Sequence, residues 1–239
     1  MNELAPQLLR RNVSRVLLVT DGFMVQTGVA RRIELALGEA GVGVATFADV
    51  QPDPTEKNVQ DGLACFRAEG AEAVVALGGG SPIDCGKAIA ILVTNPMPLS
   101  LYVGRNKIPR AGVPLVAIPT TAGTGSEVTK ASVITDTRND VKMLLMDPFL
   151  VPTVALVDYE LTFSMPQALT AAVGVDTLTH GIEAYVSRLA TPVTDPLALA
   201  CIGQVAVHLE AAWREPANRA AREGMMIAAM QGGMAFSNS

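Results

Sequence analysis

Short, continuous apolar runs alternate with segments of helical periodicity through the first part of the chain. Each run holds β-branched and other apolar residues over five or six positions, which predicts a strand buried on both faces. Between the runs, apolar residues recur at helical spacing, as at Val29, Ile33 and Leu37. This alternation predicts an α/β fold with an open, doubly wound parallel sheet. The predicted strands are 16–20, 42–47, 73–77, 114–119 and 154–158.

The pattern changes after about Ser164, where helical periodicity continues without any strand-like run. We therefore expect an α/β domain over residues 1–163 and the first part of an all-helical domain over residues 164–239. Within the first domain, the apolar alternation in 132–136 and 142–147 around a polar turn predicts a β-hairpin. The predicted helices of the second domain are 166–188, 194–213 and 219–236.

The composition excludes several classes of protein. Hydrophobic residues make up 49% of the 239 residues and charged residues 17%, which is typical of a folded chain and not of a disordered one. A net charge of −5 gives no basic footprint, so no nucleic-acid partner is expected. Glycine, proline or charged residues interrupt every apolar run, so no membrane partner is expected either. The high mean hydropathy of +0.33 indicates a buried subunit interface or a core of which one half is absent.

The N-terminal segment and the cysteines indicate a cytoplasmic protein. Residues 1–15 lack the apolar core of a secretory signal. The three cysteines, Cys65, Cys85 and Cys201, form an odd set without the spacing of a metal site. We expect them to be reduced and mostly buried, as in a reducing compartment.

A glycine-rich turn, GGGSPID over residues 78–84, follows the third predicted strand. Ser81 suits a helix N-cap, Pro82 suits the first helical position, and Asp84 stands where a capping box places its acid. A helix N-terminus at the carboxyl end of a parallel strand is a natural phosphate site. The segment lacks the G-x-G-x-x-G fingerprint, and a simple strand-to-helix turn is the alternative.

Two further segments add to this candidate site. Asp21 follows the first strand, where an acid accepts hydrogen bonds from a ribose and repels a 2′-phosphate, although Asp-Gly is also an ordinary turn pair. The segment 119–129, PTTAGTGSEVT, follows the fourth strand and offers hydroxyl and backbone N–H groups to an anion. A flexible loop is the alternative for this segment. A phosphosugar binder is a weaker alternative for the whole site, because Asp21 and the threonines favour a dinucleotide.

Asp176 and His180 are four residues apart in a predicted helix, so both side chains lie on one face and can share one metal ion. A carboxylate oxygen with an imidazole nitrogen suits Fe(II) or Zn(II). A surface ion pair is the alternative. The helix is apolar on all sides, which predicts burial and hence a need for partners. His208, in another helical segment, is expected to be a surface residue.

Together these motifs resemble the iron-containing (group III) alcohol dehydrogenase family, in particular the branch that includes lactaldehyde reductase and propanediol dehydrogenase. The resemblance extends from about residue 15 to the end of the chain. It is carried by the segments GGGSPIDCGKAIA (78–90), IPTTAGTGSEVT (118–129), SVITD (132–136), VDYELTFSMP (157–166), GVDTLTHGIEAYVS (174–187) and GGMAFSN (232–238).

The resemblance implies that NAD(H) lies across the glycine turn, with Gly79, Gly80 and Ser81 at the pyrophosphate. Asp21 matches the acid that favours NAD over NADP, and Asp53 falls where relatives often have Asn. The implied cofactor-binding residues are Asp21, Asp53, Gly79, Gly80, Ser81, Asp84, Thr120, Thr121, Thr124 and Lys142.

Asp176 and His180 match the first two metal ligands of the family and act in catalysis through the metal. The family reaction transfers a hydride between a small primary alcohol or diol, or its aldehyde, and NAD(H), while Fe(II) or Zn(II) polarises the oxygen. The resemblance also implies a homodimer or a larger assembly.

In relatives, two later histidines complete the metal site, so the resemblance predicts a chain truncated at its C-terminus. It also predicts that residues 225–236 lack packing partners. A catalytically incomplete nucleotide-binding fragment or remnant is the alternative function.

Overall fold

The computed structural model describes residues 2–239, which divide into two compact units. The sheet unit comprises residues up to 118 and residues 130–156, and the helical unit comprises 119–129 and 157–239. This division differs from the expected boundary between 163 and 164, because the threonine-containing segment 119–129 packs with the helices that follow it much later in the chain.

A five-stranded sheet in the order β2-β1-β3-β5-β8 forms the centre of the sheet unit. The pairs of β1 with β2, β1 with β3, and β5 with β8 are parallel, which confirms the parallel sheet predicted from the apolar runs. The last predicted strand is short in the structure. The strands are β1 (Arg15–Val19), β2 (Gly43–Phe47), β3 (Ala73–Gly78), β5 (Leu115–Pro119) and β8 (Val154–Ala155).

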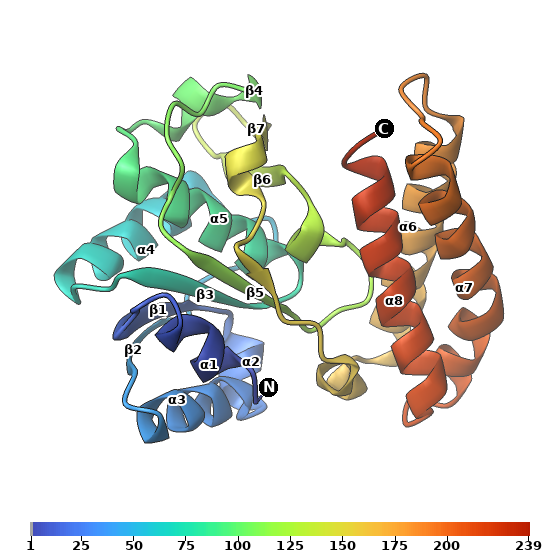
Figure 1. Cartoon of the computed structure of the whole chain (residues 1–239), viewed down its shortest axis with the longest axis horizontal. Coiled ribbons are helices and arrows are strands. Elements are labelled where there is room, and N and C mark those ends of the chain that lie inside the picture. The colour runs from blue at the N-terminus through green and yellow to red at the C-terminus, as the bar shows by residue number, and fades with distance from the viewer. Residues whose placement is uncertain (1) are drawn as a thin grey trace. The chain divides into compact units, whose positions relative to one another are not determined.

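Helices cover both faces of this sheet (Figure 1). On one face, α4 and α5 pack on alternate strand residues such as Leu17, Val74 and Ala76, and all of these are buried. On the other face, α3 packs beside β2 through its buried residues Ile33 and Leu37. The helices of this unit are α1 (Leu4–Leu9), α2 (Gly22–Gln26), α3 (Val29–Glu39), α4 (Glu56–Ala68) and α5 (Gly80–Thr94), with short 3₁₀ turns η1 (Leu99–Tyr102) and η3 (Pro148–Leu150).

A second, three-stranded sheet has the order β4-β7-β6. The predicted hairpin is confirmed, since β6 (Ala131–Asp136) and β7 (Val141–Met146) pair in antiparallel fashion. The two-residue strand β4 (Gly104–Arg105) runs parallel to β7.

The helical unit is a three-helix assembly (Figure 1). Each of its long helices contacts the other two, and α8 also contacts two 3₁₀ turns. All three predicted helices are confirmed within a few residues at each end. The elements are η2 (Ser126–Val128), η4 (Tyr159–Ser164), α6 (Gln167–Val186), α7 (Thr194–Arg214) and α8 (Arg219–Phe236).

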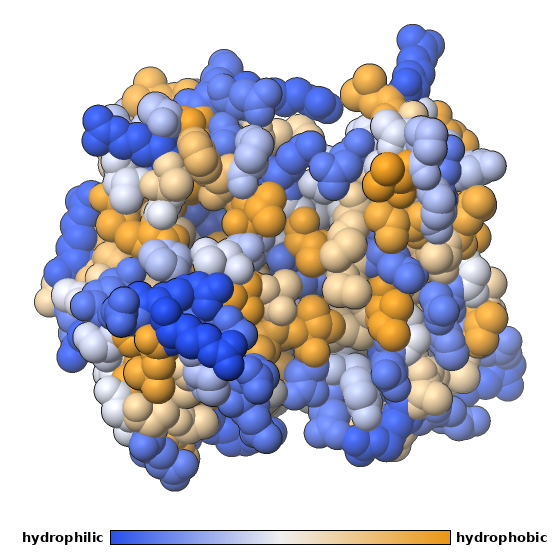
Figure 2. Space-filling view, viewed as in Figure 1, coloured by the Kyte–Doolittle hydropathy of each residue, from blue (hydrophilic) through white to orange (hydrophobic). Residues whose placement is uncertain are grey.

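Two expectations about burial in these helices are wrong. We expected residues 225–236 to lack packing partners, but Met225, Met226 and Ala229 are buried among α6, α7 and the segment 119–129. We expected α6 to be buried on all sides, but one side of it is exposed. The exposed large apolar residues of α6 and α7 are Leu169, Val175, Ile182, Tyr185, Val186, Leu199, Val207 and Trp213. Figure 2 shows apolar side chains at the surface formed by α7 and α8.

Among the described residues, α7 is long and apolar enough by length and composition to cross a membrane, contrary to the expectation that no segment of the chain is. A core helix of a soluble protein meets the same criteria of length and composition, so one such helix is weak evidence for a membrane span. Here α7 packs lengthwise against both α6 and α8.

Candidate active site

The glycine turn closes tightly around the start of α5. Gly78 has φ = +147°, and a Cβ atom at this position would lie 2.5 Å from Cγ of Pro82, so only glycine fits without strain. The helix begins at Gly80 with Gly79 as the N-cap. The prediction that Ser81 is the N-cap is therefore wrong. The half-buried backbone of Gly79, Gly80 and Ser81 forms the first turn, where helical N–H groups lack intrahelical acceptors and are free to bind an anion.

Asp21 lies beside this turn. Its Oδ1 accepts a hydrogen bond from the backbone N–H of Met24 at 2.9 Å and caps α2. Its Oδ2 lies 3.3 Å from the position of a Cβ atom built on Gly78. The structure thus brings together Asp21 and the glycine turn at the carboxyl ends of β1 and β3, which is the edge where open α/β sheets bind ligands.

Asp84 joins α5 to the hairpin instead of closing a capping box. Its Oδ2 accepts a hydrogen bond from the backbone N–H of Val133 at 2.9 Å, and its carbonyl oxygen accepts one from the Ser132 hydroxyl at 2.9 Å. One turn further along α5, the fully buried Lys87 donates to the carbonyl oxygen of Ala131 at 2.7 Å. These bonds fix β6 on α5, while a direct contact of Asp84 with a cofactor stays a prediction.

Asp53 and Lys142 form an ion pair of 2.7 Å between Oδ1 and Nζ. The pair joins the loop after β2 to β7, and both side chains are mostly exposed, at 70% and 63%. An exposed pair of this kind contributes little to stability, so it can exchange partners with a ligand at small cost.

The threonine loop, defined here as residues 119–129, packs on α6 and α8 within the helical unit. Thr120 is buried, while Thr121 and Thr124 are half-buried. The hydroxyl of Thr177 on α6 lies 3.1 Å from the carbonyl oxygen of Ala122 and 3.3 Å from that of Gly123. The threonines are therefore part of a packed segment, and the interpretation of 119–129 as a flexible loop does not fit its burial.

Asp176 and His180 face each other on α6, as their spacing predicts. His180 Nε2 lies 3.6 Å from Asp176 Oδ1, which is longer than a hydrogen bond. Two donor atoms that each lie about 2.1 Å from one tetrahedral metal ion are about 3.4 Å apart, so this pair fits a shared Fe(II) or Zn(II) ion. Asp176 is 46% exposed and His180 17%, so the carboxylate is open to solvent while the imidazole is largely covered.

The His180 ring is oriented by packing. It lies against the Phe236 ring with centroids 4.4 Å apart and an interplanar angle of 32°, and its buried Nδ1 has no hydrogen-bond partner. Phe236 is a support of the site that the sequence did not predict, although this residue stands in the segment GGMAFSN. Spacing along the chain cannot reveal this contact, because Phe236 reaches His180 from another helix. Only the resemblance of the segment around Phe236 to the family pointed to it.

No third ligand joins the pair, because the described residues contain no group of three or more His, Cys, Asp or Glu side chains suited to a metal ion. The buried Cys201 thiol lies nearby and donates to the carbonyl oxygen of Thr177 at 3.3 Å. Burial raises the pKa of Cys201 to about 11, so it is a neutral thiol at physiological pH.

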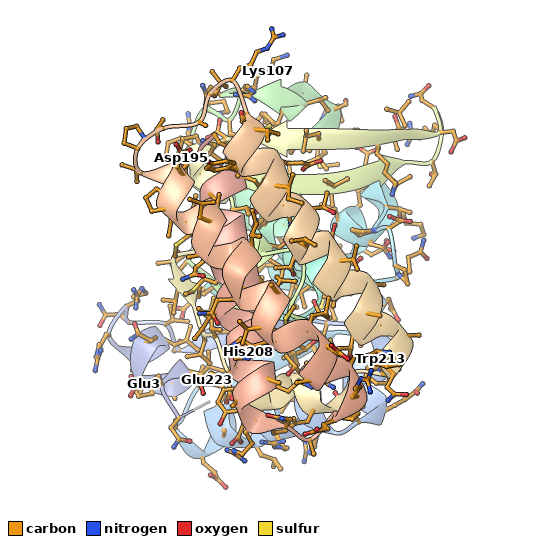
Figure 3. All side chains as sticks on the ribbon, turned by 90° about the vertical axis from the view of Figure 1, so that its right-hand side faces the viewer. Glu3, Lys107, Asp195, His208, Trp213 and Glu223 are labelled. Carbon is orange, nitrogen blue, oxygen red and sulfur yellow. The ribbon has the colours of Figure 1, made fainter. Side chains whose placement is uncertain are left out.

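His208 does not belong to the site and is not the surface residue that we expected. It is half-buried on α7 with its ring against Gly224 of α8, where an added Cβ atom would lie 2.1 Å from its Cδ2 (Figure 3).

Comparison with known families agrees with this arrangement of motifs. The sequence profile of iron-containing alcohol dehydrogenases matches residues 1–159, and the profile of the C-terminal part of that family matches residues 170–239. The chain belongs to the iron-containing alcohol dehydrogenase family. The resemblance inferred from the motifs is thereby confirmed.

Several curated members of the iron-containing alcohol dehydrogenase family are similar over the whole chain. An NAD-dependent methanol dehydrogenase of Bacillus methanolicus is 41% identical over 238 residues, which cover 100% of this chain and 62% of that protein. A 1,3-propanediol dehydrogenase of Klebsiella pneumoniae is 43% identical over 227 residues, which cover 94% of this chain and 59% of that protein. Lactaldehyde reductase of Escherichia coli (strain K12) is 39% identical, with 98% and 62% covered.

Solved structures of this family share the fold. A crystal structure of 1,3-propanediol oxidoreductase has a TM-score of 0.97 and 41% identity, covering 99% of this chain and 62% of that chain. Sulfoacetaldehyde reductase from Bifidobacterium kashiwanohense in complex with NAD⁺ has a TM-score of 0.90 and 34% identity, with 99% and 63% covered. The α/β fold with a helical region is confirmed. The chain spans about three fifths of the length of these relatives.

Proposed function

We propose that this chain carries the NAD-binding part and the first two metal ligands of a metal-dependent alcohol dehydrogenase. The substrate class is a small primary alcohol or diol and the corresponding aldehyde, as in the names of the relatives. The observation that carries the proposal is the convergence of His180 Nε2 and Asp176 Oδ1 at 3.6 Å, without a hydrogen bond, on a helix that matches the family.

The sheet unit supplies groups suited to a dinucleotide. The N–H groups of Gly79, Gly80 and Ser81 at the first turn of α5 suit a pyrophosphate. The Asp21 carboxylate beside them suits the ribose hydroxyls and disfavours a 2′-phosphate, so we infer NAD rather than NADP. Thr120, Thr121 and Thr124 are proposed to line the same cofactor path, with Asp53, Asp84 and Lys142 as further candidates.

The helical unit supplies the metal ligands. Asp176 and His180 would hold Fe(II) or Zn(II), and the bound ion would act as a Lewis acid on the alcohol oxygen while NAD accepts the hydride. The Phe236 ring keeps the His180 imidazole in one orientation, which lowers the entropy lost on binding. The Asp176 carboxylate is 46% exposed and therefore accessible to a cation.

A catalytically incomplete nucleotide-binding protein is the second candidate function. It is favoured by one observation, namely that only two metal-type side chains gather at the pair within the described part of the chain. A two-ligand site binds metal weakly and leaves most of the coordination shell to water.

The proposal includes the cellular context. Three free thiols fit the reducing cytoplasm. Exposed apolar residues on α6 and α7 support a homodimer or a larger assembly, which sedimentation velocity would detect as a mass above 25.0 kDa.

Calorimetric titration tests the two candidates directly. The purified chain is titrated with Zn(II), and with Fe(II) under anaerobic conditions, without and with saturating NAD. The enzyme proposal predicts binding at one site with a dissociation constant that rises at least tenfold in His180→Ala and stays unchanged in the control His208→Asn. NAD binding without metal binding would leave only the nucleotide-binding function, and binding of neither ligand would contradict both candidates.

A further inference from the structure

We propose that Thr177 is a positioning residue of the candidate active site, because its hydroxyl fastens the threonine loop to the helix that carries the metal ligands. The inference rests on the proposed function in that it assigns the loop to the NAD path. The inference goes beyond the proposed function, because that function assigns Thr177 neither as a metal ligand nor as a cofactor contact.

Thr177 stands directly after Asp176 on α6, about 100° further around the helix, and is fully buried. Its hydroxyl lies 3.1 Å from the carbonyl oxygen of Ala122 and 3.3 Å from that of Gly123. It also lies 2.9 Å from the carbonyl oxygen of Val173 one turn earlier on α6. The hydroxyl has one proton, so these three carbonyl oxygens share a single donor, and two of the three belong to the loop.

The two carbonyl groups that Thr177 meets need a partner. Ala122 and Gly123 are both buried, and a buried carbonyl group without a hydrogen bond is costly. They lie between Thr121 and Thr124, the half-buried threonines that we assign to the cofactor path. The bond therefore acts on the middle of the loop, where a shift of the backbone would move both hydroxyls.

The loop also packs closely against the same helices at two glycines. A Cβ atom on Gly123 would lie 2.6 Å from Cβ of Val173 on α6, and one on Gly125 would lie 2.7 Å from Cα of Gly233 on α8. These contacts fix how near the loop approaches the helices but are not directional. The Thr177 hydroxyl is a directional donor within reach of two peptide carbonyl groups of the loop, and we assign to it the orientation of these groups.

The nearby Thr179 provides a matched control. Its hydroxyl donates to the carbonyl oxygen of Val175 at 3.0 Å, one turn earlier, and the residue is exposed. Thr177→Val and Thr179→Val each remove one hydroxyl group from α6 and nearly preserve the volume of the side chain. Only the first removes a bond to the loop.

The experiment measures amide hydrogen exchange across residues 119–129 and the dissociation constant for NAD in the full chain. In Thr177→Val we expect the loop amides to exchange about tenfold faster and the dissociation constant to rise about fivefold or more. Thr177→Ser, which keeps the hydroxyl, and Thr179→Val should both stay within about twofold of the wild type for each quantity.

Unchanged exchange in Thr177→Val would overturn the proposal, and so would faster exchange with an unchanged dissociation constant for NAD. Failure of Thr177→Ser to preserve the wild-type values would also overturn it, because the hydroxyl would then not be the cause. Absence of NAD binding in the wild type would refute the proposed function, while exchange alone would still decide whether Thr177 holds the loop.

If Thr177→Val does not fold, amide exchange of the wild type in urea tests the proposal instead. As urea is added, loop amides and α6 amides should lose protection together, since a fastened loop opens only with its helix. Loss of loop protection at lower urea than α6 would show an independent loop and overturn the proposal.

Discussion

At the residue scale, hydrogen bonds lower the pKa of one carboxyl group, that of Glu72, outside the candidate site. The carboxylate of Glu72 accepts hydrogen bonds from the backbone N–H and the hydroxyl of Ser14, at 2.6 and 3.0 Å, and from the N–H of Arg15 at 3.3 Å. These bonds favour the ionised form and lower the pKa of Glu72 below its ordinary value of 4.5. The acid thereby tethers the start of β1 to the start of β3.

The pH dependence of stability follows from the sign of this shift. Because the pKa is lower in the folded state, ionised Glu72 stabilises the fold fully above pH 4.5, and the contribution disappears as the pH falls through the folded-state pKa. We expect Glu72→Gln to lower the free energy of unfolding at pH 7, with a difference from the wild type that shrinks below pH 4.5. Urea denaturation at several pH values measures this. The exposed Glu39, at the end of α3, gives the control Glu39→Gln, for which a similar trend would contradict the assignment to Glu72.

The sequence was informative about residues whose partners are close in the chain. Asp176 and His180 could be paired because four residues along a helix bring two side chains together. The role of Thr177 could not be predicted, because the carbonyl groups that it meets are 55 and 54 residues away in the chain. Phe236 was beyond prediction for the same reason, since it reaches His180 from α8.

At the scale of elements, glycines decide how closely the threonine loop approaches the helices. Gly125 has φ = +60°, and its Cβ position is 2.7 Å from Cα of Gly233 and 2.8 Å from the carbonyl oxygen of Ala229. These neighbours are backbone atoms of α8, which have no side-chain freedom to move aside. The approach of the loop therefore depends on two glycines that face each other.

Substitution at Gly125 should be costly for this reason. We expect Gly125→Ala to lower the free energy of unfolding by about 1–3 kcal/mol, through backbone strain and overpacking. Gly38→Ala is the control, because Gly38 lies in α3 with nothing within 4 Å of its Cβ position. That change should stabilise the protein by up to about 1 kcal/mol through helix propensity. Thermal unfolding of both variants measures the contrast, and equal effects would contradict it.

Element positions were predicted well because periodicity is a local property, whereas element ends and burial depend on partners. The helix α5 begins at Gly80, before the expected cap at Ser81, because Gly79 takes the N-cap position. With this start, the Asp84 side chain accepts a hydrogen bond from Val133 of the hairpin. The apolar sides of α6 were expected to be buried, but composition alone does not tell which sides of a helix find partners.

At the scale of the whole molecule, the chain crosses between the two units three times, after residues 118, 129 and 156. Both ends of the threonine loop are joined by peptide bonds to segments of the sheet unit, but the loop itself packs in the helical unit. A cut between Leu156 and Val157 therefore breaks the only peptide connection to 157–239 and leaves the packed loop in place.

We expect the two pieces of such a cleaved chain to remain associated. A protease site inserted between Leu156 and Val157 allows the cut, and size-exclusion chromatography under native conditions should give one peak containing both fragments. The same sample in denaturant serves as the control and should give two. Separation under native conditions would show that the loop contacts do not hold the helical unit.

The discontinuity of the helical unit also orders the events of synthesis. The ribosome delivers the threonine loop before the helices that pack on it, and Gly233, which lies against Gly125, is synthesised about 100 residues after the loop. The strands up to β8 are all available by residue 155. The sheet can thus form while residues 119–129 are still a loop without the helices on which they pack. The nascent chain is open to proteolysis at this loop until α8 has left the exit tunnel.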